Sequence, residues 1–567
     1  MKSEIQKIFR GEVDDSEETL LKYSHDASLL EVMPQIVVYP MDSEDVKNLV
    51  KWVNENKTNP PAGGPNLSIT ARCAGTDMSG GAIGESIIMD FTRHMNKLIG
   101  GPLPMQNKDE WEICVQPGMF YRNFEKITLA KGLILPCYTA SKSLNAMGGM
   151  YGNNSAGERT LKYGKTEDYI LSAKIVFSDG NEYVIEPLSQ SELNKKMAMG
   201  GAEGEIYRRI YKLIMENEED IKHAKPNVHK NSAGYYVWNV MQNKAYFDLN
   251  KLLVGSQGTL GIVTEITFKI IPEIKYSKLV AIFMNDLGPL GRLVDEILEL
   301  NPETLEAYDD KTMKLAIKFF PDFLKNKGFL GIFKLGWSFL PEFFMMLRGG
   351  LPKLIILAEF AGENEAEVNR QCIKLEEKIK DFKLKIHITK DTAEANKYWN
   401  IRRESFALLR KHIKGKRTAP FIDDIIVRPE FLPKFLPELN AILSKYKLTY
   451  TLAGHAGDGN FHIIPLMDFR RADTASIIME LGEKVYNLVI KYRGSITAEH
   501  NDGLIRTPYL QKMYEEKIIR IFREIKDIFD PKNIFNPGKK IATQKEGGTK
   551  EYIASHIAKE HKAVHRV

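Results

Sequence analysis

The sequence predicts an α+β fold organised as two consecutive domains, and two observations lead to this prediction. Strand-like and helix-like segments alternate along the chain, which is typical of mixed helix and sheet layers. The pattern changes near residue 274, because three glycine-rich loops precede this point and a strand–helix–strand–helix run follows it. A chain of 567 residues is also too long for one ordinary core. The expected divisions are an N-terminal helical arm over 1–31, domains over 32–273 and 274–540, and a polar tail over 541–567.

The first predicted domain opens with a strand and a helix. The β-branched run at 34–40 predicts the strand, and 43–56 has apolar positions at helical spacing, with Ser43 as the expected N-cap. Residues 252–274 predict two strands separated by a glycine-rich break, after which the domain is expected to end. Further strands are predicted where short apolar runs end in turn residues, at 67–70, 86–91, 112–118 and 170–180.

The second predicted domain repeats a strand–helix order. Residues 278–286 predict a strand and 288–300 a helix. A second strand at 353–362 is followed by a long charged helix over 363–382. A further helical pattern covers 398–412. Two successive strand–helix pairs favour a second α+β domain.

The segment 327–350 is unusually rich in Phe, Leu, Met and Trp. Lys334, Pro341 and Glu342 interrupt it, so it lacks the roughly 20 apolar residues that a membrane span requires. Two interpretations stay open. The segment is either a buried helical hairpin of the second domain or a surface segment that lies flat on a bilayer with Trp337 inserted.

The composition of the chain limits which binding partners and which cellular compartment are expected for the protein. The net charge is +5, and no dense Lys/Arg stripe with interleaved aromatic residues occurs, so we expect no nucleic-acid binding. The first twenty residues do not read as a signal peptide. Four dispersed cysteines form no C-x-x-C pair, so an iron–sulfur cluster built by this chain is not expected. The expected location is the cytoplasm, with peripheral contact of 327–350 with the inner face of the cell membrane as the open alternative.

Three glycine-rich loops in the first predicted domain indicate a single long ligand. They cover 71–82, 146–170 and 255–265, and each adjoins a predicted strand. In the first loop, Gly75 and its neighbours let backbone N–H groups approach an anion closely, which suits a pyrophosphate. No G-x-G-x-x-G opens a helix here, so a Rossmann dinucleotide site is not supported.

Six motifs together resemble those of the FAD-linked oxidase family with the vanillyl-alcohol-oxidase, or PCMH, type of flavin domain. In chain order they are ARCAGTDMSGGA, GGMYGNNSAG with KYG, GSQGTLGIVTE, GHAGDGNFH, GSITAEHNDG and FNPGK. The branch that they resemble contains the D-lactate dehydrogenases, glycolate oxidase flavin subunits and D-2-hydroxyglutarate dehydrogenases. The resemblance covers residues 20–541. It implies a PCMH-type FAD-binding domain followed by an α+β substrate domain of the FAD-linked oxidase C-terminal type.

The resemblance implies FAD as the cofactor of the first domain. Binding is expected to be non-covalent, because the first loop reads CAGTD where relatives with covalent flavin have a histidine. The pyrophosphate would lie on Cys73, Ala74, Gly75, Thr76 and Asp77. The rest of the cofactor would contact Ser141, Gly148, Gly149, Asn154, Ser155, Gly157, Gly261, Ile262 and Val263.

Two positions depart from the family pattern. Residues 137–141 read CYTAS where the family often has P-D-P-S-S, which leaves the cofactor contacts there in doubt, apart from Ser141. Asn501 replaces the glycine of the family's E-H-G. Asparagine tolerates the left-handed backbone region, so we expect this turn to be retained.

The spacing of His455 and His462 raises the question of a metal. On an unbroken strand the two side chains would point to opposite faces, but the GDGN turn between them can bring both imidazoles together. With Glu499 they would form a two-histidine, one-carboxylate set with open positions, which is typical of a catalytic site. Such ligands suit Zn²⁺, Mn²⁺ or Fe²⁺. The alternative is that these histidines are hydrogen-bonded core residues.

Three further residues are candidates for the chemistry. His500 is the expected general base, because its unperturbed pKa of about 6.5 lies close to working pH; a supporting role behind the metal ligands is the alternative. By the resemblance, Arg402 in W-x-I-R would grip the substrate carboxylate, for which arginine is well suited. Asp424 would either orient its neighbours or form a structural salt bridge.

Together these features predict an FAD- and metal-dependent dehydrogenase of a small D-2-hydroxy acid, with D-lactate or glycolate first. The alternatives are a 2-hydroxyglutarate or bulkier hydroxy-acid dehydrogenase, a non-redox flavoprotein of the alkyl-glycerone-phosphate synthase type, and a flavin-binding scaffold subunit without turnover. Reduced FAD would pass its electrons to an external acceptor, for which an iron–sulfur subunit, an electron-transfer flavoprotein and a membrane quinone all stay open.

Overall fold

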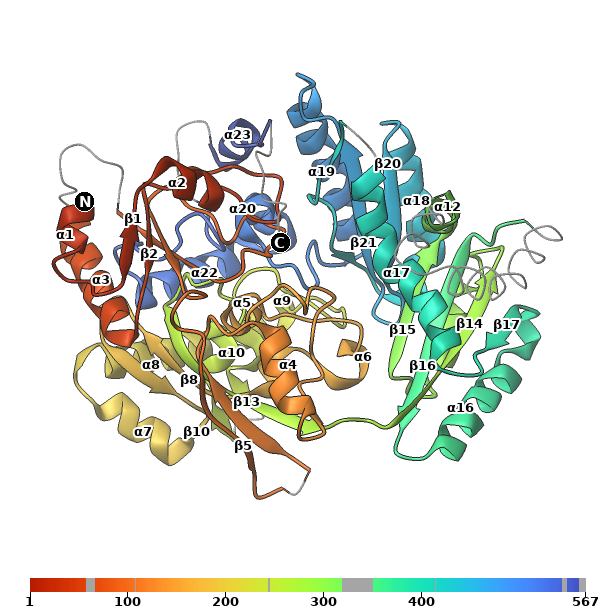
Figure 1. Cartoon of the computed structure of the whole chain (residues 1–567), viewed down its shortest axis with the longest axis horizontal. Helices are drawn as coiled ribbons and strands as arrows, with labels where there is room; N and C mark the ends of the chain where they lie inside the picture. Colours follow the sequence, from red (N-terminus) through yellow and green to blue (C-terminus); the bar gives the residue numbers. More distant parts are fainter. Residues whose placement is uncertain are drawn as a thin grey trace.

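The computed structural model describes all residues except 58–66, 108, 243–244, 319–349, 413–414, 543–547 and 560–567. The first half of the chain forms one side of the molecule, and the segment that begins at β14 (Tyr276–Met284) forms the other (Figure 1). The chain then returns to the first side through α20 (Gly503–Arg506) and α22 (Glu516–Phe529). Nearly all of the apolar segment 327–350 lies outside the described residues, so neither interpretation of it can be compared with the structure.

The first half begins with a small sheet whose strands β2, β4 and β3 are parallel. Helix α3 (Ser43–Asn56) follows β2, as the sequence predicts, but its N-cap is Asp42, whose carboxylate accepts from the amides of Glu44 and Asp45. The expectation for Ser43 was therefore wrong by one residue. The strand order is β1 (Glu12–Asp14), β2 (Ile36–Tyr39), β4 (Ile87–Asp90) and β3 (Ile69–Arg72). Because β1 pairs with β2, the segment 1–31 contains a strand of this sheet beside its helices α1 (Lys2–Ile5) and α2 (Glu17–Tyr23).

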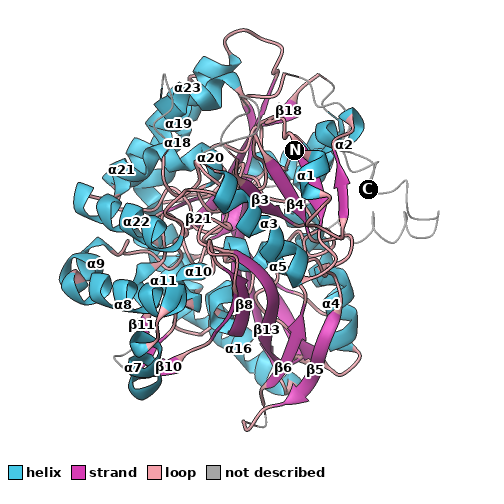
Figure 2. Cartoon of the chain, turned by 90° about the vertical axis from the view of Figure 1, so that its left-hand side faces the viewer, coloured by secondary structure: helices cyan, strands magenta, loops and turns pink. Residues whose placement is uncertain are grey.

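A larger antiparallel sheet forms the centre of the first half, with β5, β6, β8 and β13 visible side by side in Figure 2. The order is β5 (Leu98–Pro104), β6 (Trp111–Val115), β13 (Ile262–Pro272), β8 (Ile170–Val176) and β9 (Glu182–Ile185), and β7 (Leu133–Ile134) also pairs with β13. Residues 252–274 hold one strand rather than the two predicted, because Asn250–Leu253 form the helical turn α10. A short apolar run of this kind does not distinguish helix from strand by periodicity.

The second half is organised around a sheet of eight described strands. The order is β17 (Lys385–Ile388), β14, β16 (Leu354–Gly362), β15 (Thr304–Asp309), β20 (Thr449–His455), β21 (Asn460–Met467) and β18 (Arg417–Thr418), and β19 (Ile425–Ile426) pairs with β21. Helices α11 (Leu290–Leu298), α16 (Glu365–Lys378), α18 (Leu432–Ser444) and α19 (Thr474–Lys491) contribute to the main core cluster of this half. A separate cluster joins the sheet to Tyr398 and Trp399 of α17 (Thr392–His412). The predicted elements at 278–286, 288–300 and 353–362 are confirmed as β14, α11 and β16.

The C-terminal part of the chain packs back onto the first half. Phe522 and Phe529 of α22 lie in the apolar cluster that also contains β13 and α8 (Gly201–Glu216). Ile534 and Phe535 lie in the cluster beneath the small parallel sheet. The contacts of residues 516–535 therefore cross the sequence division expected near 274. The remaining described α-helices are α4 (Tyr121–Leu129), α5 (Met147–Asn153), α6 (Thr160–Tyr163), α7 (Gln190–Ala198), α9 (Glu218–Ala224), α12 (Asp310–Lys318), α21 (Leu510–Met513) and α23 (Gly548–Ser555).

Candidate active site

One cavity of about 370 Å³ joins the glycine-rich loops of the first half to the histidine motif of the second. Its lining includes most of the residues singled out from the sequence: Cys73, Ala74, Gly75, Thr76, Asp77, Ser141, Gly148, Gly149, Ser155, Gly157, Gly261, Val263, Arg402, His455, His462, Glu499 and His500. Motifs more than 300 positions apart in the chain therefore share one space. Two predicted cofactor residues, Asn154 and Ile262, do not line it.

Asn154 and Ile262 have structural surroundings that explain their positions. Asn154 caps α5 in the left-handed region, and its side chain accepts from the amide of Glu167 and donates to that carboxylate. Ile262 is 1% exposed in the core beneath the parallel sheet. Their neighbours Ser155, Gly261 and Val263 face the cavity instead.

The first glycine-rich loop leaves the end of β3 as a backbone cradle. The amides of Ala74, Gly75 and Thr76 donate no hydrogen bond to another described residue, and all three residues line the cavity. Gly75 has φ +65°, and a Cβ there would lie 2.3 Å from the Arg72 guanidinium. Asp77 holds the loop together by accepting from the amides of Ser79 and Gly81. Unpaired amides facing a cavity suit an anion such as the pyrophosphate of FAD.

The second loop leaves room beside this cradle, and residues of the third loop also line the cavity. A Cβ at Gly149 would meet no atom within 4 Å, so the wall there is open backbone that a flat ligand can approach closely. Gly148 is tightly placed, because its Cβ would lie 2.5 Å from Pro117. The residues present therefore fit an extended flavin cofactor along the three loops.

The two histidines converge because β20 and β21 form a hairpin. Ala453 pairs directly with His462, and His455 pairs with Asn460, which places both histidines on one face as diagonal neighbours. Their ring centroids are 5.2 Å apart. Gly459 in the turn has φ +76°, and a Cβ there would lie 1.9 Å from the Val427 carbonyl oxygen. The predicted convergence is confirmed.

Glu499 completes this group from a loop after α19. Its Oε1 lies 3.2 Å from His455 Nε2, and its Oε2 lies 3.9 Å from His462 Nε2. The donor atoms of the three residues all lie within 4.8 Å of one another. Ligands about 2.0–2.1 Å from one ion lie roughly 3–4 Å apart, so these donor atoms lie close to the separations that a shared divalent ion requires.

The second nitrogen of each imidazole is held by a neighbour. His455 Nδ1 lies 2.5 Å from Glu306 Oε1, and His462 Nδ1 lies 2.9 Å from the Asp423 carbonyl oxygen. Partners of this kind fix the tautomer and orientation of metal-binding histidines. Both Nε2 atoms consequently point toward Glu499. The chemistry of this donor set therefore fits a divalent metal.

Lys230 is a further member that the motifs did not reveal. Its side chain is 1% exposed, and its Nζ lies 2.5 Å from Glu499 Oε1 and 2.8 Å from Asp458 Oδ2. This buried cation balances the two carboxylates. Because it contacts Oε1, Oε2 is the Glu499 oxygen better placed to bind an ion.

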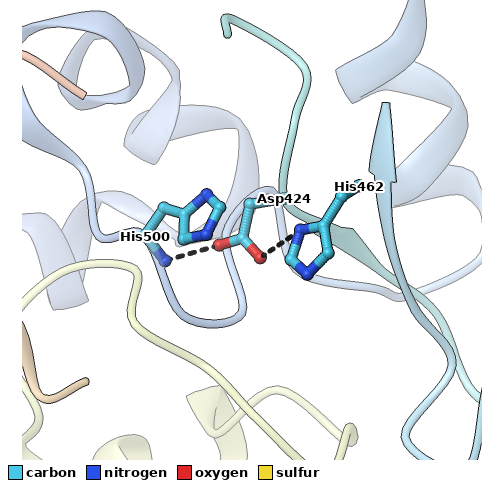
Figure 3. A group of neighbouring side chains, drawn as sticks. All are labelled: Asp424, His462 and His500. Carbon is cyan, nitrogen blue, oxygen red and sulfur yellow. Dashed lines mark hydrogen bonds and ion pairs between the residues drawn. The ribbon is translucent and has the colours of Figure 1, made fainter. Parts of the chain in front are cut away.

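A second group shares His462 and contains Asp424 and His500 (Figure 3). The His462 and His500 rings are stacked with centroids 5.1 Å apart. Asp424 Oδ2 accepts from the amides of Ala498, Glu499 and His500 at 2.7–2.8 Å, and its Oδ1 accepts from Asn460 Nδ2. Both oxygens are thus engaged, and the carboxylate shapes the loop that presents Glu499 and His500. This supports the predicted orienting role of Asp424.

The charges of the site set the protonation of its three histidines. Burial disfavours the imidazolium of His455, but the carboxylates of Glu306 and Glu499 outweigh it and raise the pKa to about 9. Burial, His500 and His455 together lower the pKa of His462 to about 4. For His500, burial is again outweighed, here by Asp424 and Asp423, and the pKa rises to about 9. His462 is therefore neutral at physiological pH, as a metal ligand must be, whereas a metal would have to displace a proton from His455.

Arg402 lies on α17 at the edge of the same cavity. Its Nε lies 2.7 Å from Glu306 Oε2, and the other oxygen of that carboxylate contacts His455. Glu306 is fully buried on β15 and joins the two predicted residues. No motif surrounds Glu306 or Lys230 in the sequence. Glu306 could have been found as a charged residue within a buried strand. The sequence around Lys230 carries no comparable signal.

Comparisons with known proteins agree with this architecture. Residues 34–185 match the model of an FAD binding domain, and residues 274–540 match that of the C-terminal domain of FAD linked oxidases. A D-2-hydroxyglutarate dehydrogenase of Pseudomonas putida is 26% identical over 94% of this chain and 50% of its own length. The chain thus spans about half the length of that curated relative. The glycolate oxidase subunit GlcD of Bacillus subtilis is 26% identical over 93% of this chain and 94% of its own length.

Solved structures show the same fold. The crystal structure of p-cresol methylhydroxylase with substrate bound matches with a TM-score of 0.64 at 15% identity, over 93% of both chains. The predicted PCMH-type flavin domain with an α+β second domain is therefore confirmed. The chain belongs to the FAD-linked oxidase family.

Proposed function

We propose that this protein is an FAD- and metal-dependent dehydrogenase that oxidises a small D-2-hydroxy acid, such as D-lactate or glycolate, to the 2-oxo acid. The observation that supports this most directly is the single cavity in which the amide cradle of 73–77 and the His455–His462–Glu499 group meet. The similarity to relatives named as a D-2-hydroxyglutarate dehydrogenase and a glycolate oxidase subunit supports a substrate of this chemical class.

The cofactors supply two kinds of chemistry when bound. FAD, held without a covalent link by the three glycine-rich loops, is the acceptor of the two-electron hydride from the substrate's α-carbon. A divalent ion, Zn²⁺, Mn²⁺ or Fe²⁺, on His455, His462 and Glu499 polarises the substrate's oxygens and lowers the pKa of its hydroxyl.

His500 is the group proposed to take the hydroxyl proton. Its Nδ1 lies 2.7 Å from Asp423 Oδ2, which leaves Nε2 for the substrate. With a pKa of about 9 in the metal-free site, His500 would be protonated at neutral pH and could not act as a base. A cation on the neighbouring ligands lowers this pKa by repulsion. With a metal held by His455, His462 and Glu499, His500 would therefore be neutral and able to accept the hydroxyl proton.

Arg402 is proposed to bind the substrate carboxylate. The pairing of its Nε with Glu306 fixes the plane of the guanidinium, so that less side-chain freedom is lost when a carboxylate binds. The same Glu306 holds His455. The carboxylate grip and the metal group are therefore positioned by one buried side chain.

The electrons are proposed to leave through an external acceptor, which could be an iron–sulfur subunit, an electron-transfer flavoprotein or a quinone. All four cysteines, Cys73, Cys114, Cys137 and Cys372, are free thiols in the structure, and none belongs to either side-chain group that could hold a metal in the described part of the chain. No helix in that same part of the chain is long and apolar enough to cross a membrane.

Anaerobic bleaching of the oxidised-flavin absorbance band tests this proposal. The purified protein is mixed with D- and L-2-hydroxy acids before and after chelation, and divalent ions are then added back. Bleaching by a D-acid that is lost with chelator and restored by one ion is the expected result. A yellow protein that no hydroxy acid bleaches would contradict the dehydrogenase, and a protein that cannot take up FAD would contradict the cofactor site.

A further inference from the structure

The sheet face that presents the two histidines continues as an apolar wall of the cavity. Thr451 pairs directly with Ile464, two residues along each strand from the pair formed by Ala453 and His462. Side chains two positions apart on a strand share a face, so Thr451, Ala453 and Ile464 lie on the face of His455 and His462. All five residues line the cavity. We call Thr451, Ala453 and Ile464 the apolar wall, in which the Thr451 hydroxyl is the one polar side-chain group.

The apolar wall lies beside the proposed metal group. Successive same-face positions on a strand are roughly 6–7 Å apart, so the apolar wall begins within one side-chain length of the two histidines. Ile464 is 8% exposed and Thr451 is 4% exposed, so this part of the cavity excludes most water. A substrate held by its carboxylate and hydroxyl at the histidines would place its C2 substituent against these side chains.

Three described arginines line the cavity, and each has a partner; Arg72 lies beside the amide cradle and donates to the Ala82 carbonyl oxygen at 3.1 Å. Arg402 is paired with Glu306 at 2.7 Å, and it is the residue assigned to the first carboxylate. Arg403 is paired with Glu158 across the two halves at 2.5 Å, and its guanidinium lies over Trp399. A second carboxylate on the substrate would have to share one of these guanidinium groups with the carboxylate that it already binds, or do without a cationic partner. A buried charge without a partner is strongly unfavourable, whereas an alkyl group needs none.

We propose that the apolar wall selects D-2-hydroxy acids whose C2 substituent is an alkyl group, in preference to acids with a second carboxylate. This inference rests on the proposed function and names the substrate class within it. It separates this chain from the relatives named for D-2-hydroxyglutarate. The reaction is the same for either class: the C–H bond gives its hydride to FAD, the O–H proton goes to His500, and a C=O bond forms.

The test compares specificity in the FAD- and metal-loaded protein. The rate constant of anaerobic flavin reduction, divided by the apparent Kd, is measured for D-lactate, D-2-hydroxybutyrate and D-2-hydroxyisocaproate, and for D-2-hydroxyglutarate and D-malate. The expected preference for the alkyl acids is at least about tenfold, because hydrophobic pockets discriminate by about that much per methylene. Calorimetric binding of the corresponding 2-oxo acids gives a readout without turnover and should show the same order.

Substitutions then connect the preference to the wall. Ile464→Arg should shift the ratio toward D-2-hydroxyglutarate by about tenfold or more, because a buried arginine provides the missing partner. Ile373→Arg is the matched control, since Ile373 is 52% exposed on α16 and does not line the cavity. If the Ile464 variant fails to fold, Thr451→Val, which makes the wall more apolar, should raise the preference for alkyl acids.

The outcomes separate this inference from the proposed function. If the unaltered protein oxidises D-2-hydroxyglutarate or D-malate more efficiently than the alkyl acids, the proposed selection by the apolar wall is wrong. The proposed dehydrogenase activity would still hold. If neither wall variant changes the preference, the apolar wall is not the origin of that preference. Absence of flavin reduction by every hydroxy acid would overturn both proposals together.

Discussion

The two sides of His462 look alike in composition but differ in how their donor atoms are used. On one side, His455, His462 and Glu499 keep an imidazole Nε2 or a carboxylate oxygen directed at one another, while other atoms anchor them. On the other side, Asp424 uses both oxygens on backbone amides and Asn460, and His500 Nδ1 contacts Asp423. Proximity alone would make both groups metal sites. The hydrogen bonds favour the proposed ligation at the first group and the proposed orientation and proton transfer at the second.

The largest expected effect is on the second side, at His500. The substitution His500→Gln should slow flavin reduction by about 10²–10⁴-fold, the usual contribution of a general base, while metal affinity stays within the error of the titration. In the unaltered protein the rate should rise with pH through the pKa of His500, which the metal sets below about 9, because only the neutral imidazole accepts a proton. The variant should lose this rise.

Stopped-flow absorbance and calorimetric metal titration on the same preparations check the prediction for His500. His223→Gln is a matched control, because the side chain of His223 is 78% exposed and does not line the cavity. Parallel loss of metal and of flavin reduction in the His500 variant would move this residue into the ligand group and remove the distinction between the two sides.

The next effect is on the first side, at His462. The substitution His462→Gln should weaken Mn²⁺ or Zn²⁺ binding by more than the roughly 10–100-fold that loss of a supporting partner costs. The FAD content should be unchanged, because the amide cradle of 73–77 lies in the other half of the chain. Calorimetry of the metal-free protein measures the affinity, and flavin absorbance measures the cofactor content. Retention of full metal affinity would argue that these histidines are hydrogen-bonded core residues.

The same two groups show which site residues could be predicted from the sequence and which could not. Local motifs predicted the amide cradle, the hairpin that brings His455 to His462, and the pairing of Glu499 with His500, because each depends on a few consecutive residues. Glu306 and Lys230 were not predictable in this way, since they reach His455 and Glu499 from 149 and 269 positions away. Long-range sheet order places Glu306 on β15 beside β20. At the level of fold, the apolar run at 252–254 was misassigned because it is too short to reveal a helical period.

A smaller effect is expected at Asp424, and it sharpens the assignment of this residue as a positioning group. Asp424→Ala leaves the amides of Ala498, Glu499 and His500 without their acceptor, and such buried donors cost about 1–3 kcal/mol each. Asp424→Asn retains an acceptor oxygen and should cost about half as much. Urea unfolding of the metal-free protein measures both. Metal affinity in the Asn variant should fall by about tenfold at most, as for other supporting partners.

The result that would reverse this assignment is specific. If Asp424→Asn abolishes metal binding as completely as His462→Gln and leaves the unfolding midpoint unchanged, then Asp424 is a ligand. The group in Figure 3 would then be the metal site.

The smallest effect is expected at Asn501, where the family pattern has glycine. As the sequence predicted, Asn501 adopts the left-handed region, with φ +66°. Glycine would relieve a backbone strain of about 1 kcal/mol, but it would remove the side-chain bonds to the carbonyl oxygens of Gly255 and Asn153, each worth about 1 kcal/mol. Asn501→Gly should therefore lower the free energy of unfolding by only about 1 kcal/mol, whereas Asn501→Ala, which lacks both compensations, should cost about 2–3 kcal/mol.

The order of the two Asn501 variants decides what asparagine contributes here. Chemical denaturation of the metal-free protein gives both values. A glycine variant more stable than the unaltered protein would mean that the bonds to Gly255 and Asn153 add little, and that asparagine is tolerated only for its backbone. The expected order, with glycine between the native residue and alanine, would mean that Asn501 joins the loop of Glu499 and His500 to the cofactor loops. The orientation of the base would then depend on contacts from the half of the chain that binds the flavin.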